Sequence, residues 1–137
     1  MAFVIDASVA AAWLMPDEMH QVADAARSRM LVEPAIVPAI WWFEVRNVFI
    51  VAERRGRIDR ARTGQALALL ADLPVSVDHD SDESVTLGLC REHRLSVYDA
   101  AYLALAIREG LSLATLDAAL ARAARAEGVE FVGNTSD

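Results

Sequence analysis

Near its start the chain reads Phe3-Val4-Ile5-Asp6-Ala7-Ser8-Val9, and this stretch decides the fold. Three apolar residues, β-branched or aromatic, lead directly into an acid, a pattern typical of a buried strand that ends in a carboxylate. The residues after Asp6 favour a helix as far as Met15, and in open α/β sheets ligands bind where strands end and helices begin. Asp6 is therefore a candidate site residue, although an aspartate that only caps the following helix would look the same.

Short apolar segments alternate with helical patterns along the rest of the chain. The pattern predicts strands at 3–5, 36–37, 75–77, 111–114 and 129–132, and helices at 7–15, 16–29, 39–55, 58–70, 81–94, 98–109 and 117–126. This alternation favours an α/β fold with a mainly parallel sheet covered on both faces. Because no repeat or linker interrupts it, we expect one domain over residues 1–132 and a polar tail over residues 133–137.

The composition narrows the classes of function. A net charge of −7 argues against unaided binding to a polyanion, but all 13 basic residues are arginines, which suit bidentate phosphate contacts. A single cysteine, Cys90, excludes an intrachain disulfide and is expected to be an inert thiol. No signal peptide or membrane span is visible, so we expect a cytoplasmic protein. A hydrophobic content of 55% indicates that a partner covers some apolar surface.

Glu44 is the most informative acid, because no helix cap explains it. It lies inside the predicted helix 39–55, with Ile40, Trp41 and Val48 among its neighbours at helical spacing. A carboxylate on an apolar stripe has to be paired, bound to a metal or protonated, since burying it alone is too costly. A salt bridge to an arginine remains the alternative to a functional role.

Asp99 and Asp117 each have a simple structural explanation as well. Ser96 and Asp99 fit a capping box, and Asp117 follows the predicted strand 111–114 where a helix begins. With Asp6 and Glu44, however, all four acids could meet at one edge of the sheet. Unit charges about 4 Å apart repel by roughly 4 kcal/mol at an effective dielectric near 20, so such a cluster would need a cation. Oxygen ligands favour Mg²⁺ or Mn²⁺ over zinc.

Together these segments resemble the PIN-domain family of metal-dependent nucleases, and within it the VapC-type toxins of toxin–antitoxin pairs. The likeness is carried, in the family's order, by Val4-Ile5-Asp6-Ala7-Ser8, Pro38 followed by Glu44, Tyr98-Asp99-Ala100-Ala101-Tyr102-Leu103-Ala104-Leu105-Ala106 and Thr115-Leu116-Asp117.

The resemblance implies a three-layer sandwich around a five-stranded sheet. It also implies an acidic site of Asp6, Glu44, Asp99 and Asp117, supported by the hydroxyls of Ser8 and Thr115. Asp6 and Asp99 would be the principal metal ligands, with Glu44 and Asp117 bound directly or through water. The implied activity is endoribonuclease cleavage of cellular RNA by a Mg²⁺-activated or Mn²⁺-activated water. The implied partners are a cognate antitoxin and a second copy of the chain, together forming a hetero-oligomer.

Several other features remain open. Arg46, Arg54 and Arg55 are either a solvated face or contacts for the RNA backbone. Trp41 and Trp42 are adjacent on one helix and cannot face the same way, so one of them could lie in a groove for a partner helix.

Other motifs favour no further function. The acidic run 78–82 begins like a calcium loop but lacks the required glycine, and the three histidines are expected at the surface. A non-catalytic adaptor with the same fold, acting through protein binding, is the alternative to the nuclease.

Overall fold

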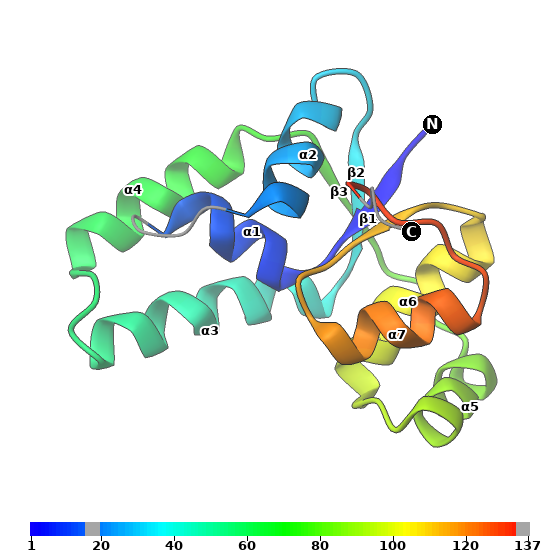
Figure 1. Cartoon of the computed structure of the whole chain (residues 1–137). Coiled ribbons are helices and arrows are strands. Elements are labelled where there is room, and N and C mark those ends of the chain that lie inside the picture. Colours follow the sequence, from blue (N-terminus) through cyan, green and yellow to red (C-terminus); the bar gives the residue numbers. More distant parts are fainter. Residues whose placement is uncertain (16–19, 134–137) are drawn as a thin grey trace.

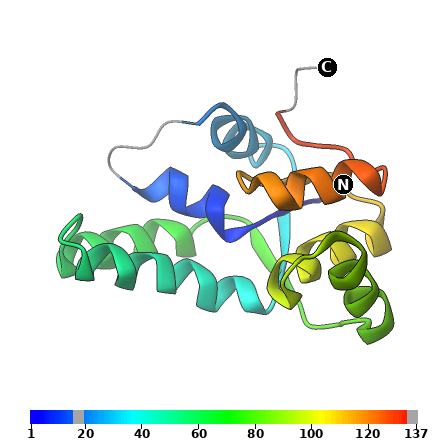
Figure 2. The same cartoon turned by 60° about the horizontal axis from the view of Figure 1, so that its bottom comes forward.

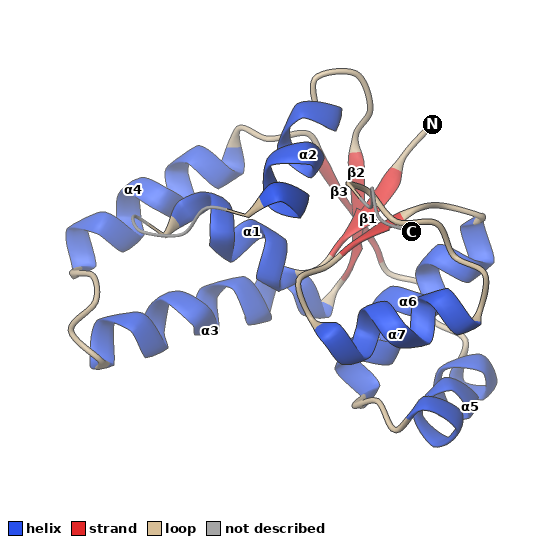
Figure 3. Ribbon diagram, in the orientation of Figure 1, coloured by secondary structure: helices blue, strands red, loops and turns tan. Residues whose placement is uncertain are grey.

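A computed structural model describes residues 1–15 and 20–133 of the chain. A parallel sheet lies at its centre, with helices on both sides (Figures 1 and 3). Its elements follow the order β1 (Phe3–Ile5), α1 (Ala7–Leu14), α2 (Gln21–Arg29), β2 (Ala35–Pro38), α3 (Ile40–Arg54), α4 (Arg60–Ala71), β3 (Val75–Asp78), α5 (Glu83–His93), α6 (Val97–Glu109), β4 (Leu113–Ala114) and α7 (Ala118–Ala126).

The strands are ordered β3-β2-β1-β4 and every pair is parallel. Helices α1 to α4 lie on one side of the sheet and α5 to α7 on the other (Figure 1). This distribution is what right-handed crossovers require, because the chain moves outward from β1 to β3 and then returns past β1 to β4. The expected α/β architecture with parallel strands is therefore confirmed.

The expected fifth strand is wrong. Residues 129–132 form only an isolated parallel bridge between Phe131 and Leu113, so the sheet has four strands in the described part of the chain. Leu113 donates to the Glu130 carbonyl at 2.9 Å, and Val132 donates to the Leu113 carbonyl at 3.1 Å. Because β4 is only two residues long, it offers too short an edge to pair with a full strand.

The core is built from the strands and the apolar faces of the helices. Phe3, Val4 and Ile5 of β1 are fully buried, as expected for a central parallel strand. Phe49 of α3 and Leu103 of α6 are also fully buried, one from each helical layer. The start of the predicted helix 16–29 and the last four residues of the predicted tail lie outside the described residues.

The sheet positions the candidate site through its register. Ile5 pairs with Ala114, so the residues that follow, Asp6 and Thr115, leave adjacent strands side by side. The Asp6 amide donates to the Ala114 carbonyl at 3.2 Å, which extends the pairing by one step. Figures 1 and 2 show α3 and α4 extending away from the sheet beside α1. No helix among the described residues is long and apolar enough to cross a membrane.

Candidate active site

Asp6 lies at the carboxyl end of β1 with only 4% of its surface exposed. Its carboxylate caps α1 by accepting from the Val9 amide at 3.2 Å, so the helix cap that the sequence allowed is present. The cap uses only Oδ1, which also accepts from Ser8, while Oδ2 accepts from Thr115. The carboxylate therefore does more than cap the helix. Burial raises the pKa of Asp6 from 3.8 to about 6. The hydrogen bonds from Ser8, Thr115 and Val9 lower this pKa, and the nearby charge of Asp99 raises it.

Ser8 and Thr115 tie Asp6 to the loop that follows β4. Ser8 Oγ donates to Asp6 Oδ1 at 2.6 Å and accepts from the Leu116 amide at 3.0 Å. Thr115 Oγ1 donates to Asp6 Oδ2 and accepts from the Asp117 amide at 3.0 Å. Each hydroxyl therefore bridges the carboxylate to a backbone amide of the β4–α7 loop. The two residues hold the carboxylate in one orientation and fix where Asp117 leaves the sheet.

Glu44 enters the site from α3 and is partly buried. Its partner is Tyr102 of α6, whose hydroxyl donates to Glu44 Oε1 at 2.5 Å. The expected alternative, a salt bridge to an arginine, is absent among the residues that the structure describes. Burial raises the pKa of Glu44, the Tyr102 hydrogen bond lowers it, and the charge of Asp99 raises it further. Glu44 is thus held by a neutral donor that leaves its charge uncompensated.

Asp99 lies in the first turn of α6, where Ser96 caps the helix by accepting from the Asp99 amide at 3.1 Å. Burial raises the pKa of the Asp99 carboxyl, the charge of Asp117 adds to this, and a hydrogen bond with Ser96 lowers it. Asp117 caps α7 by accepting from the Leu120 amide at 2.9 Å. The predicted cap at Asp117 is therefore confirmed, and of the predicted capping box the structure shows the bond from the Asp99 amide to Ser96. Charge repulsion between the Asp99 and Asp117 carboxylates coexists with these caps.

The four acids share one electrostatic environment. Asp99 repels Asp6, Glu44 and Asp117, although these residues come from four separate segments of the chain. No three of the four place an oxygen each within 4.8 Å of one another in the described structure, so their spacing is wider than in a closed metal cluster. The donor set is entirely oxygen, and burial, with the charge of neighbouring acids, raises the pKa values of Asp6, Glu44 and Asp99. Both features fit a hard divalent cation such as Mg²⁺ or Mn²⁺.

A cleft of about 440 Å³ begins beside Ser8 and Leu116 and continues along α3. Asn47, Val48 and Val51 form part of its wall, and its far end is lined by Arg55 and Arg57. Its lining therefore changes from apolar to basic with distance from the acids.

The tryptophans and arginines of α3 that the sequence suggested as partner or RNA contacts do not all lie in this cleft. Trp41 is buried and Trp42 is 50% exposed, so the two do face different ways, but neither lines the cleft. The Arg46 guanidinium stacks 4.0 Å above the Trp42 ring, outside the Glu44 face. Arg54 is exposed in the last turn of α3 and Arg55 follows it into the cleft lining.

Sequence reasoning assigned no role to Tyr102, whereas it named Arg57 among the arginines that are either a solvated face or contacts for the RNA backbone. A signal for Tyr102 was present in the sequence. It is a tyrosine within the apolar run of α6, and a buried tyrosine hydroxyl needs a hydrogen-bond partner. The prediction of surface histidines is wrong for His93, whose side chain is only 12% exposed.

Comparison with known proteins identifies the family. The model of the PIN domain matches residues 3–126. The chain belongs to the PIN domain family. Within that family it is 33% identical over 124 residues to Ribonuclease VapC3 of Pyrobaculum aerophilum, covering 88% of this chain and 93% of that protein.

Solved structures support the PIN fold. PAE2754 from Pyrobaculum aerophilum superposes with a TM-score of 0.67 at 24% identity, covering 90% of this chain and 84% of that one. Mycobacterium tuberculosis VapC20, a toxin that cleaves the sarcin–ricin loop, gives a TM-score of 0.60 at 16% identity, covering 88% and 94%. A toxin–antitoxin complex from Klebsiella pneumoniae gives 0.55 at 21% identity, covering 84% and 86%.

Proposed function

We propose that this PIN-domain chain is a metal-dependent endoribonuclease and the toxin of a toxin–antitoxin pair. The observation that carries the proposal is the buried Asp6 carboxylate, held by Ser8 and Thr115 with the charge of Asp99 nearby, in a chain similar over most of its length to a VapC ribonuclease. Acids kept close at a cost in electrostatic energy favour a site that binds cations over a purely structural one.

Asp6 and Asp99 would hold the cation, with Glu44 and Asp117 as further ligands, direct or through water. When bound, Mg²⁺ or Mn²⁺ would lower the pKa of a water molecule and polarise a phosphodiester. Ser8 and Thr115 orient the Asp6 carboxylate, and Tyr102 orients that of Glu44. These neutral donors fix the acids without neutralising them, which preserves the negative charge that a cation requires.

RNA is the substrate class that the cleft and the family likeness support. The chain carries a net charge of −7, so RNA needs local positive charge to approach the acids. Arg55 and Arg57 at the far end of the cleft supply it. The cleft wall between them and Ser8 is largely apolar and would contact sugars and bases. Arg46 and Arg54, nearby on α3, would add further contacts with the RNA backbone.

The partner in this proposal is an antitoxin that covers α3. Trp42 and Phe43 are 50% and 62% exposed on that helix, and Ile50, about two turns beyond, is 40% exposed. Exposed apolar side chains gathered on one helix are typical of a surface that a partner covers. Binding of an antitoxin, and pairing of two copies of the chain, would cover it. Co-expression with a short gene next to the toxin gene, followed by co-purification with wild type but not with Trp42→Ser, tests the antitoxin.

The nuclease is tested by incubating the purified chain with total RNA and Mg²⁺ or Mn²⁺, with and without EDTA. We expect cleavage that EDTA stops and that Asp6→Asn and Asp99→Asn each reduce by at least about 100-fold, the range typical of lost catalytic groups. Asp24→Asn is the matched control, because Asp24 is an exposed acid on α2. Cleavage by both variants at the wild-type rate would contradict the assignment. Absence of metal-dependent cleavage of any RNA would favour the adaptor.

A further inference from the structure

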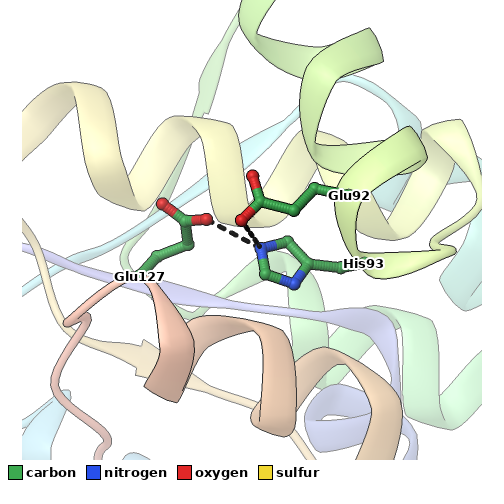
Figure 4. A group of neighbouring side chains, drawn as sticks. All are labelled: Glu92, His93 and Glu127. Atoms are coloured by element: carbon green, nitrogen blue, oxygen red, sulfur yellow. Dashed lines mark hydrogen bonds and ion pairs between the residues drawn. The ribbon is translucent and has the colours of Figure 1, made fainter.

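A second group of metal-ligating side chains lies at the ends of α5 and α7 (Figure 4). Glu92 and His93 come from the last turn of α5, and Glu127 follows the last residue of α7. Asp117 caps the opposite end of α7, so about 15 Å of helix separates this group from the acidic site. No role in the proposed nuclease reaction uses these three residues.

The three donor atoms converge on one point. His93 Nε2 lies 2.7 Å from Glu127 Oε2 and 3.8 Å from Glu92 Oε2, and all three residues offer ligand atoms within 4.8 Å of one another. Bonds of about 2.0–2.2 Å to one cation in tetrahedral geometry place ligand atoms about 3.3–3.6 Å apart. The observed spacings lie on either side of that range, so small side-chain rotations would bring all three donors onto one ion.

The surroundings favour a cation at this point. Both α5 and α7 end here, and the carboxyl end of a helix carries partial negative charge. The left-handed backbone of Arg94, with φ of 57°, ends α5 directly after His93. Within the described residues His93 is the ion-pair partner of both carboxylates, with no arginine nitrogen within 4.0 Å of either. Two carboxylates and two helix ends thus meet at one imidazole.

We propose that Glu92, His93 and Glu127 form a binding site for Zn²⁺, with water in the fourth position. One imidazole and two carboxylates are a ligand set that suits zinc, whereas the all-oxygen acidic site suits Mg²⁺. His93 is largely shielded and Glu127 partly so, with side-chain exposures of 12% and 26%, which limits competition from solvent at two of the three ligands. Glu92, at 68%, is exposed and leaves an entry path for the ion.

Zinc at this position would connect the end of α5 to the end of α7. Both helices contact α6, which carries Asp99 and Tyr102. The ion would therefore act as a clamp on the layer that supplies half of the acidic site. Its expected effect is on stability and not on the chemistry itself.

The test is a Zn²⁺ titration of the full chain followed by the NMR signals of the imidazole rings. His20, His79 and His93 give three ring signals, and because His20 lines the cleft that begins beside Ser8, His79 is the reference ring. The titration is run in the Asp6→Asn/Asp99→Asn background to weaken zinc binding at the acids. We expect the His93 signals to shift and saturate at one equivalent while those of His79 stay in place.

Four variants, two at the site and two controls, complete the experiment. Glu127→Gln should weaken zinc binding at least about 10-fold while the histidine signals remain visible. Glu130→Gln, an exposed acid three residues later, is the matched control and should bind as before. His93→Ala should remove the zinc-dependent rise in melting temperature, whereas His79→Ala should not. Unchanged His93 signals up to about 1 mM Zn²⁺, equal shifts of all three rings, or equal affinity in Glu127→Gln would overturn the proposal.

Discussion

Tyr102 Oη donates a 2.5 Å hydrogen bond to Glu44 Oε1, joining α6 to α3 across 58 residues of sequence. Burial raises the pKa of Tyr102 further above its ordinary value, followed by the hydrogen bond and the charge of Glu44, then by Asp6 and Asp99. The hydroxyl is therefore a permanent donor among three acids. It fixes one oxygen of Glu44 and leaves the other available.

Tyr102→Phe should raise the Mg²⁺ concentration needed for half-maximal RNA cleavage by about 10–100-fold, because a ligand that loses its orienting partner loses metal affinity. The fold should persist, with a loss of about 1.5–3 kcal/mol for a hydrogen bond to a charged group. Activity measured against Mg²⁺ concentration separates the two effects. Tyr98→Phe is the control, since Tyr98 is exposed on the same helix. An unchanged Mg²⁺ midpoint in Tyr102→Phe would remove the positioning role.

Asp6→Asn should make the metal-free protein more stable above pH 6. The folded protein binds the Asp6 proton more tightly than the unfolded chain, since the pKa rises from 3.8 to about 6. Stability therefore falls as pH increases through this window, by about 3 kcal/mol in total, and is restored only below pH 4. The amide variant has no such loss. Urea unfolding in EDTA at several pH values measures the difference, and parallel stability curves for the two proteins would disprove it.

Mg²⁺ should raise the melting temperature of the wild-type chain and have little effect on Asp99→Asn. A cation that binds only the folded state adds about 2.7 kcal/mol at 100 times its dissociation constant. Asp99 repels the other three acids, so its removal should also stabilise the metal-free protein by relieving that repulsion. Thermal unfolding with and without Mg²⁺ gives both results. Asp24→Asn should respond to Mg²⁺ as the wild type does.

Replacing Arg55 and Arg57 by glutamine should raise KM for RNA without a comparable change in kcat. Both residues line the far end of the cleft and touch none of the acids. Each lost phosphate contact should also reduce the dependence of binding on salt, by a slope of about one in a plot of log affinity against log salt. Arg27→Gln on α2 provides an exposed control. A fall in kcat at unchanged KM would place these arginines outside the substrate path.

The sequence predicted the elements whose signals are local. The apolar run Phe3–Ile5 predicted a buried strand, and the acid after it predicted where that strand ends. The parallel sheet followed from alternation of strands and helices. A local sequence pattern does not show how long the neighbouring strand will be. Residues 129–132 look like a strand, but β4 is too short to pair with them beyond Phe131.

Contacts between distant segments explain the other differences. Tyr102 lies in an apolar helix and gained its partner only when α3 packed nearby. His93 lies in the polar run 91–94, which indicates an exposed position, and it is covered because Glu127 reaches it from α7. The pairing of Ile5 with Ala114 likewise depends on the chain returning from β3 past β1 to form β4. The four acids could be listed from sequence, whereas the groups that hold them could not.

The bond from Thr115 to Asp6 spans 109 residues and has a consequence for synthesis on the ribosome. In a growing chain Asp6 leaves the ribosome long before the Thr115 hydroxyl that orients it. Fragments that end before β4 lack this contact, the adjoining Asp117 and the strand beside β1. A growing chain with the activity proposed for this one would therefore acquire that activity only after β4 and the loop that follows it have been synthesised.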